Sequence, residues 1–561
     1  MPSIRRTHLR RLAVACLATC LLSACETQPT LASLSSSLPA MPSLPPMLGG
    51  TQPPISPEAA LPPAPERKWA DPVVDANNNR AAGWGLVSMP AMDAYLNRLY
   101  AQLKDMSGHP DWPGRVYVLA DPALKSTASA AGNIYVSITW LQSMESEDEV
   151  FALLSHEFGH VYLNHSVVYD ASDAGLVASQ LGVIGVALAH RGTQVANLNG
   201  AYAIVAIREV AESTLMPAWK RSVEEEADRF GVALSLRAGY SYPRGFKTFL
   251  ERVASYDDVE RERAQKAQAE LEQQARAAGI QAVQDQSRQA QAQARQKNPN
   301  APAIDTTDLQ VQFQNSLFDA TSSVKRAFSS TADKLRETHD DATVREENLA
   351  KAVAAAIAER PRPPGRVAPW EAVRKEAGTA EILAHYALLG PAEEAIARKN
   401  YPEALRIATR AASGRTASDA LPLMTLVSAN LAARPNVSVT ALRDRHRNSV
   451  ERSWKFELMA GQELARTNRT AGRKLIDEQF AYFRKAPVLW PDVIAFYRDN
   501  NYLDEARAMA GTCRLEMVSY SESCQESAKT VAEKQAEKAA GERKGKEIAE
   551  RNMPKFLRPK P

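Results

Sequence analysis

Two histidines that can share one metal ion lie near the end of the first third of the chain. Residues 156–160 read His-Glu-Phe-Gly-His, and the apolar residues among positions 149–155 recur at helical spacing. We therefore expect His156 and His160 on one face of one helix, where two imidazoles at positions i and i+4 can bind the same zinc ion. Glu157 is too close to the first histidine to join it as a ligand, and is placed to act on a water molecule as general base.

A catalytic zinc site needs a third protein ligand. A metzincin would carry Gly at position 163 and His at position 166, but the sequence has Leu163 and Ser166, which excludes that class. His165 lies one residue from the required place, and its more ordinary interpretation is a histidine near the negative end of a helix dipole. Glu224 and Asp228 are better candidates, because a helix would present both on one face. One carboxylate could then bind zinc while the other orients a ligand imidazole.

The acidic run at residues 224–226, taken alone, could equally be a solvated helix face. A resemblance to a known family favours the metal site. The zinc motif followed by Glu224-x-x-Ala-Asp resembles the HtpX and CAAX-prenyl-protease family of gluzincin zinc metallopeptidases, most closely its soluble periplasmic members that carry TPR repeats. Residues 132–137 also resemble the strand before the metal helix in that family. Residues 338–340, Thr-His-Asp, resemble the family's Thr-His-Pro, with Asp340 replacing the proline and Arg345 following.

This resemblance covers roughly residues 85–355 and implies a zinc-dependent endopeptidase with one zinc ion per chain. We expect the strand at residues 133–138 to bind the substrate backbone as an extended partner. A histidine such as His339 would more ordinarily belong to a surface loop, but the resemblance implies that it caps the zinc at rest; the alternative is that it assists turnover. The implied metal ligands are His156, His160 and Glu224, the general base is Glu157, and the supporting residues are Asp228, Arg221 and Arg345.

The amino-terminal residues predict where in the cell the protein is located. Four arginines within the first eleven residues precede the apolar stretch 12–22, which is too short to span a bilayer and indicates a signal peptide at residues 1–24. The sequence Leu-Ser-Ala-Cys at positions 22–25 resembles a bacterial lipobox, in which Cys25 would be lipidated; a bare signal-peptide cysteine is the alternative. Glu26 replaces the aspartate that retains lipoproteins at the inner membrane. We therefore expect an outer-membrane lipoprotein facing the periplasm, held by its lipid chains.

The charge and the cysteine content are compatible with a periplasmic location. The formal net charge of +3 includes the four arginines and no acidic residue of positions 1–24, so the chain without them carries a charge of −1 and shows no sign of nucleic-acid binding. Outside the signal peptide and lipobox, two cysteines remain, Cys513 and Cys524. An even pair in an oxidising compartment favours a disulfide, with two free thiols as the alternative.

The length of 561 residues leaves room for several domains. Residues 25–67 are rich in proline and serine and are expected to be a tether that holds the catalytic domain clear of the membrane. A zincin-type metallopeptidase domain, mainly α with a small β-sheet, is expected at residues 68–360. A Gln/Ala-rich segment at about 257–302 interrupts it and lacks an apolar face for continuous packing. The apolar stretch 175–189 is too short for a confident membrane span, and a buried or lid-like helical hairpin is expected there.

The last third of the chain predicts an α-helical, TPR-like domain at residues 375–515. Residues 400–405 and 502–507 have similar sequences, and their alanines, Ala404 and Ala506, are 102 positions apart, which is three periods of 34. A plain helical bundle is the alternative. TPR-like stacks present a groove for peptides, so this domain would deliver substrates. The tail at residues 525–561 alternates lysine and glutamate and is expected to be solvated.

Together these features predict a lipid-anchored periplasmic zinc endopeptidase that hydrolyses misfolded or stalled envelope proteins in outer-membrane quality control. Its expected partners are unfolded or misassembled envelope proteins, the outer membrane and the outer-membrane assembly machinery. A second hypothesis is a chaperone or assembly scaffold that acts through the TPR-like domain while the protease is held latent. Intact zinc ligands argue against a scaffold alone.

Overall fold

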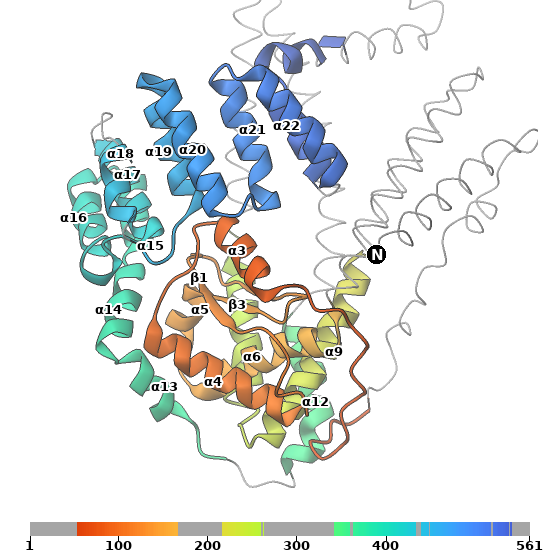
Figure 1. Cartoon of the computed structure of the whole chain (residues 1–561). Coiled ribbons are helices and arrows are strands. Elements are labelled where there is room, and N and C mark those ends of the chain that lie inside the picture. Colours follow the sequence, from red (N-terminus) through yellow and green to blue (C-terminus); the bar gives the residue numbers. More distant parts are fainter. Residues whose placement is uncertain are drawn as a thin grey trace, which may run out of the picture. The chain divides into compact units, whose positions relative to one another are not determined.

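The computed structural model describes residues 53–165, 216–259, 262, 342–358, 363–433, 439–447, 449–517, 520–537 and 539–540. All of these lie in the unit formed by residues 52–561, which is distinct from residues 1–51. The fold is mainly helical with one small sheet among the described residues, which confirms the predicted fold class (Figure 1). Several predicted features lie outside the described residues, namely Cys25, His339, the apolar stretch 175–189 and most of the Gln/Ala-rich insertion.

The sheet has three short strands in the order β1-β3-β2, formed by Val116–Leu119, Ile134–Ser137 and Ser126–Ala128. Strand β3 is buried throughout, pairs in parallel with β1 and pairs in antiparallel with β2. Both of its edges are therefore occupied, so the expectation that the strand at residues 133–138 receives an extended substrate is wrong. A strand can be recognised from its own residues, but its neighbours in the sheet are chosen by tertiary packing.

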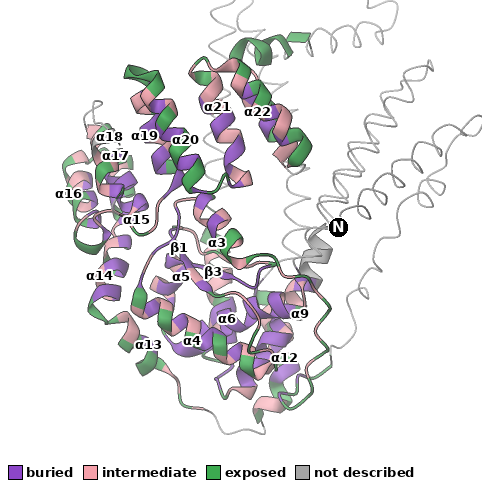
Figure 2. Cartoon of the chain, viewed as in Figure 1, coloured by how far each residue is buried: buried purple, intermediate pink, exposed green. Residues whose placement is uncertain are grey.

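The predicted metal helix is α6, Glu147–Tyr162, and it is buried on nearly every side (Figure 2). Of its residues only His160 is not fully buried. Helix α4, Pro90–Met106, packs against it, and both contribute to one hydrophobic core. A helix that is enclosed all round cannot shift without disturbing the whole core. This places two of the predicted ligands, His156 and His160, on an element that the core holds firmly.

The first turn of α6 consists of three buried acids, which is unusual because buried carboxylates need partners. Their negative charges are favourable at the amino end of a helix dipole, and each one is bound by groups from elsewhere in the chain. Glu147 accepts from the hydroxyls of Tyr95 (2.8 Å) and Tyr240 (2.9 Å), Asp148 accepts from the backbone amides of Ser241 (2.9 Å) and Arg366 (2.7 Å), and Glu149 pairs with Arg252 (2.8 Å). These contacts fix the start of the metal helix.

The end of α6 is held by Arg67. Its guanidinium donates to the carbonyl oxygens of Val161 and Tyr162. The guanidinium carbon also lies 4.9 Å from the ring centroid of Trp69 and 4.5 Å from that of Trp112. A positive charge at the carboxyl end of a helix is stabilised by the helix dipole and satisfies carbonyls that have no partner within the helix. Opposite charges therefore complement both ends of the metal helix.

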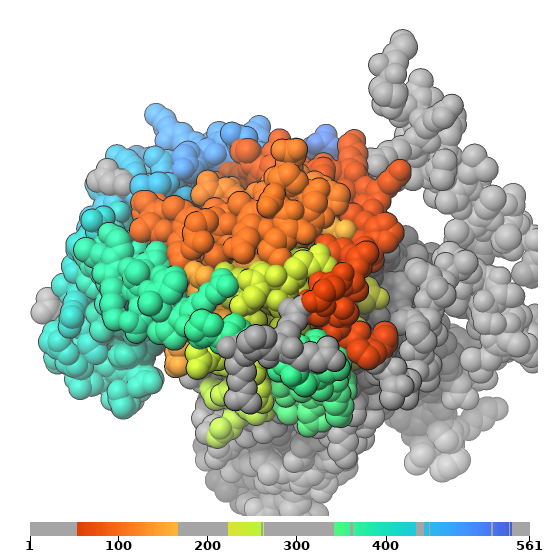
Figure 3. Space-filling view, turned by 90° about the horizontal axis from the view of Figure 1, so that it is seen from below, coloured from red at the N-terminus to blue at the C-terminus, as the bar shows by residue number. Residues whose placement is uncertain are grey.

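Residues 53–67, which we call the strap, were expected to belong to the free tether. The structure instead places the strap against the peptidase domain. Arg237 of α9 (Met216–Arg237) donates to the carbonyls of Pro57 (2.8 Å) and Ala59 (2.6 Å), and the amide of Ile55 donates to the carbonyl of Ala352 (2.9 Å) in α12, Ala342–Ala358. In Figure 3 this red stretch lies against the yellow-green and green helices. The tether prediction is therefore wrong for residues 53–67.

Further helices continue the chain beyond α12. Helix α13 packs into the core of the peptidase part, because the indole of Trp370 is fully buried and donates to the carbonyl of Met144 (2.9 Å). The core of the peptidase part thus extends past the predicted boundary at residues 360–375. The helices are α13 (Val367–Arg374), α14 (Ala377–Tyr386), α15 (Leu389–Ala397), α16 (Tyr401–Ala411), α17 (Ala420–Ala433), α18 (Val439–His446), α19 (Trp454–Thr467), α20 (Arg469–Tyr482), α21 (Trp490–Asp499), α22 (Leu503–Glu516) and α23 (Ser521–Ala528).

The 102-residue separation found in the sequence recurs in the backbone. Lys399 (φ 61°) and Asn501 (φ 59°) adopt the same left-handed turn before α16 and α22, and they are 102 positions apart, like Ala404 and Ala506. Gly472 of α20 falls two periods after Ala404, and a Cβ atom there would lie 2.6 Å from the Cβ of Ala465. Small residues thus recur where the second helix of each pair meets the first, as in a TPR-like stack.

Two other features of this region bear on the sequence analysis. The structure joins Cys513 and Cys524 by a disulfide, with an S–S distance of 2.06 Å, which ties α22 to α23. Among the residues that the structure describes, none of the helices combines the length and the apolar character needed to cross a bilayer.

Arg67→Met should loosen the end of the metal helix, because it removes the donor to two helix-terminal carbonyls while keeping an apolar stem. Hydrogen bonds from a charged donor to such carbonyls contribute about 1–3 kcal/mol. Hydrogen–deuterium exchange of residues 147–162 should therefore accelerate. Arg115→Met is the control, since Arg115 also lies over an aromatic ring, that of Tyr117 (5.1 Å). Equal exchange in both variants would contradict the capping role.

Candidate metal centre

Helices α6 and α9 approach each other closely enough to bring the predicted ligands together. A Cβ atom on Gly159 would lie 2.9 Å from the carbonyl oxygen of Ala227, and one on Gly231 would lie 2.9 Å from the amide nitrogen of His156. Only glycine permits such a backbone contact. The two glycines and the small Ala227 between them therefore explain why α9 can present carboxylates to the histidines of α6.

The structure gathers the three predicted ligands into one cluster. The Nε2 atoms of His156 and His160 are 3.2 Å apart, and the carboxylate of Glu224 lies 3.4 Å from the first and 3.5 Å from the second. One ligand atom from each residue lies within 4.8 Å of the others. Two imidazole nitrogens and one carboxylate oxygen form a donor set that suits zinc and leaves a coordination position open. The residues present therefore fit a catalytic zinc ion.

The charges around this cluster favour a cation. Burial lowers the pKa of His156, but hydrogen bonds to Asp228 and Glu224 outweigh it and raise that pKa to about 10. Burial lowers the pKa of His160 to about 3, so this imidazole is neutral and can offer a lone pair. For Glu224, burial raises the pKa, but the neighbouring histidines and Arg345 prevail and hold it well below its usual range. The negative field that would protonate His156 equally attracts a metal ion.

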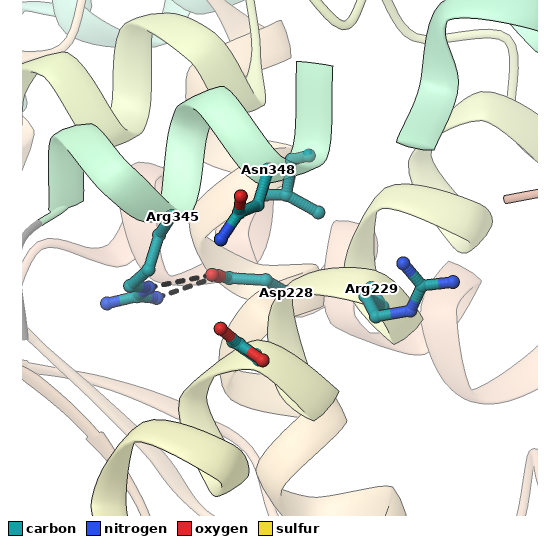
Figure 4. A pocket seen from close by; sticks show the side chains of 6 residues that line it. Asp228, Arg229, Arg345 and Asn348 are labelled. Atoms are coloured by element: carbon teal, nitrogen blue, oxygen red, sulfur yellow. Dashed lines mark hydrogen bonds and ion pairs between the residues drawn. The ribbon is translucent and has the colours of Figure 1, made fainter. Parts of the chain in front are cut away.

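Asp228 supports His156 from behind. Its carboxylate is buried, accepts from Nδ1 of His156 (2.9 Å) and receives two hydrogen bonds from Arg345 (2.7 and 2.8 Å), which Figure 4 shows. Arg345 also lies 3.3 Å from Glu224. Burial opposes ionisation of Asp228, but Arg345 and His156 lower its pKa below the ordinary value of 3.8. The ion pair therefore stabilises the fold above that pH, and this contribution is lost as the pH falls through the folded pKa.

Glu157 lies on α6 beside the cluster but outside the ligand set. Its side chain is buried, and burial raises its pKa, while the charge of His156 and a hydrogen bond to Ser126 oppose that rise. Ser126 begins β2, and β2 packs against α6. A buried carboxylate with a raised pKa suits proton transfer near neutral pH. The predicted general base and the outer strand of the sheet thus face each other.

His165, an alternative third ligand by sequence, does not enter the cluster. Its Nδ1 atom lies 3.0 Å from Nδ1 of His160, on the side opposite the predicted metal, and its Nε2 atom lies 3.4 Å from Glu226. Asn164, with φ of 60°, turns the chain at the end of α6 and so brings the imidazole of His165 next to that of His160. His165 therefore lies just past the end of α6 and is not among the clustered ligands. Spacing alone could not reveal its contact with His160, which depends on the left-handed residue between them.

The remaining predicted site residues cannot be located. His339 and Cys25 lie outside the described residues, and so does the side chain of Arg221.

A small pocket lies beside the Asp228–Arg345 pair, and Figure 4 shows it from close by. Its other lining residues are Glu225, Arg229, Asn348 and Leu349.

Comparisons with known proteins agree with this geometry. Residues 90–256 match the model of peptidase family M48, a stretch that contains both histidines and the downstream carboxylates. The chain is also 25% identical over 170 residues to the beta-barrel assembly-enhancing protease of Yersinia pestis. That match covers 30% of this chain and 34% of the relative, so the chain spans about a third of the length of the protein it matches.

Asp228→Asn should weaken zinc binding about 10- to 100-fold, the usual effect of disturbing the partner of a ligand histidine. The amide can still accept from His156, but it leaves the guanidinium of Arg345 without its carboxylate. Competition with a chromogenic chelator measures the affinity. Asp105→Asn, on an exposed residue at the end of α4, serves as control. An unchanged zinc affinity in the Asp228 variant would remove this residue from the metal centre.

Proposed function

We propose that the chain is a zinc-dependent endopeptidase of the bacterial cell envelope, because residues 90–256 match the model of peptidase family M48. The proposal names zinc as the metal, one ion per chain, and unfolded or misassembled envelope proteins as substrates. The single observation that carries it is the convergence of His156, His160 and Glu224, from two helices, on one point beside a buried glutamate. Buried imidazoles and carboxylates need partners, and a shared zinc ion would be a partner for all three.

The proposed chemistry divides among the residues of the cluster. When bound, zinc would supply Lewis acidity that activates water and polarises the scissile carbonyl. Glu157 takes the proton from the attacking water and returns it to the leaving amine. The metal-facing nitrogen of His156 must give up its proton to bind zinc, whereas His160 is already neutral. The other nitrogen of each imidazole lies at hydrogen-bond distance from a partner. Asp228 and Arg345 hold the first of these imidazoles in place.

The outer strand β2 is the proposed docking edge for substrate. Strand β3 is enclosed, and the bridge between Leu86 and Leu119 covers part of the outer edge of β1. An extended peptide paired with β2 would run beside α6, and so beside Glu157. Backbone pairing tolerates many side chains. Broad specificity follows, which suits the removal of unfolded proteins.

The proposed location and partners depend on the sequence and on the relative. The signal peptide and lipobox support anchoring to the outer membrane at Cys25, facing the periplasm. The name of the Yersinia pestis relative refers to the assembly of β-barrels. We therefore include the outer-membrane assembly machinery among the proposed partners, with the TPR-like helices as the surface that meets substrates. His339 is proposed to cap the metal at rest or to assist turnover.

Glu157→Gln tests the chemistry. The amide cannot accept the proton from water, so hydrolysis of an unstructured protein such as casein should fall at least ~10²-fold, the lower range for removal of a general base. Zinc content, measured by mass spectrometry of the metal, should stay equal to that of the unmodified chain, because Glu157 is not a ligand. A variant that keeps activity within tenfold of the unmodified chain would refute this role.

Cys25→Ser tests the proposed anchoring to the outer membrane. Without a lipid attachment site, the protein should move from the membrane fraction to the soluble periplasmic fraction, because the proposed lipid chains are its anchor. Cell fractionation followed by immunoblotting measures this. Substitution of Cys513 and Cys524 by serine is the matched control and should leave the protein with the membrane. If the Cys25 variant still sediments with membranes after a high-salt wash, another segment anchors the chain.

A further inference from the structure

The two histidines of the metal centre differ in what holds their second nitrogen. Nδ1 of His156 faces the carboxylate of Asp228 at 2.9 Å, whereas Nδ1 of His160 faces another imidazole, that of His165, at 3.0 Å. Both distances are those of a hydrogen bond. A ligand histidine normally donates through its second nitrogen to a group that fixes its tautomer and orientation. His165 occupies that place for His160.

The contacts permit one consistent arrangement of protons. Nε2 of His160 faces the metal cluster, 3.2 Å from Nε2 of His156 and 3.5 Å from Glu224, so this atom must be free of a proton to bind zinc. Its Nδ1 then carries the proton and donates to Nδ1 of His165. His165 in turn carries its proton on Nε2, which faces the carboxylate of Glu226 at 3.4 Å.

Burial makes this chain of hydrogen bonds specific. His165 is only 3% exposed, so each nitrogen of its imidazole needs a partner within the protein. The side chain of Glu226 is 60% exposed, so its carboxylate remains hydrated and meets His165 at the surface. The backbone supports the contact, because Asn164 adopts a left-handed conformation immediately before His165.

We propose that His165, oriented by Glu226, is a positioning residue that fixes the tautomer and ring orientation of the zinc ligand His160. It is the counterpart of the Asp228–Arg345 pair behind His156, with a neutral imidazole in place of a carboxylate. This inference rests on the proposed function, since it assumes that the cluster binds zinc. It assigns His165 to the metal centre without making it a ligand.

Two substitutions of His165 test the proposal by zinc affinity rather than by activity. His165→Leu keeps the apolar volume but removes the acceptor, and should raise the zinc dissociation constant about 10- to 100-fold. His165→Asn places an amide oxygen where Nδ1 stands and can still accept from His160. Its zinc dissociation constant should therefore stay within about threefold of that of the unmodified chain, a much smaller change than the loss of a supporting partner causes. Chelator competition gives each constant, and thermal unfolding of the zinc-free proteins verifies that both variants fold.

Two controls match these variants. His385→Leu removes a histidine of α14 whose Nδ1 lies 2.7 Å from the hydroxyl of Thr416, and Glu251→Gln neutralises an exposed acid that pairs with Lys247. Both should bind zinc like the unmodified chain. Glu226→Gln should show a smaller loss of affinity than His165→Leu, because its amide oxygen still accepts from the imidazole.

The outcomes separate this inference from the proposed function. A folded His165→Leu variant with unchanged zinc affinity would overturn the positioning role while leaving the zinc site intact. Complete loss of zinc in both His165 variants would also overturn it, because it would make the imidazole itself a ligand. An unmodified chain that binds no zinc would refute the proposed function first. Loss in the leucine variant with recovery in the asparagine variant is the expected result.

Discussion

Burying two imidazoles and several carboxylates inside an apolar domain is unfavourable unless every polar atom finds a partner. Helix α6 meets this constraint along its whole length. Its acidic first turn is paired with tyrosines, backbone amides and arginine, its last carbonyls receive Arg67, and its histidines face Glu224, Asp228 and His165. The rest of the peptidase fold can be understood as the set of elements that deliver these partners.

The partners come from distant parts of the chain, and close packing brings them together. Gly159 and Gly231 let α6 and α9 touch through their backbones, which sets the depth at which Glu224 meets the histidines. The strap then crosses α9 and α12 and reaches the end of α6 through Arg67. Elements that carry ligands or their supports are thereby linked to one another. A displacement of any of them would change the geometry of the metal centre.

The sequence predicted the local features well, because a helix and its facing residues follow from spacing alone. The helix of His156 and His160, the carboxylates of α9 and the 102-residue repeat spacing were all accessible in this way. Pairing in the sheet was not, so the strand at residues 133–138 was assigned an edge that it lacks. The packing of the strap was missed because it depends on hydrogen bonds between residues far apart in the sequence. The contact of His165 with His160 was missed because it depends on the left-handed conformation of Asn164. Composition cannot distinguish a proline-rich tether from a proline-rich segment that lies on a surface.

The ligand assignment is the claim on which this account of the protein depends, and zinc content tests it most directly. The purified chain and a Glu224→Ala variant should be dialysed against the same zinc-buffered solution and their metal measured by mass spectrometry. We predict one zinc ion per unmodified chain and a clearly lower content in the variant, because two imidazoles alone bind zinc weakly compared with a three-ligand site. Absence of zinc from the unmodified chain, or full retention by the variant, would contradict the assignment.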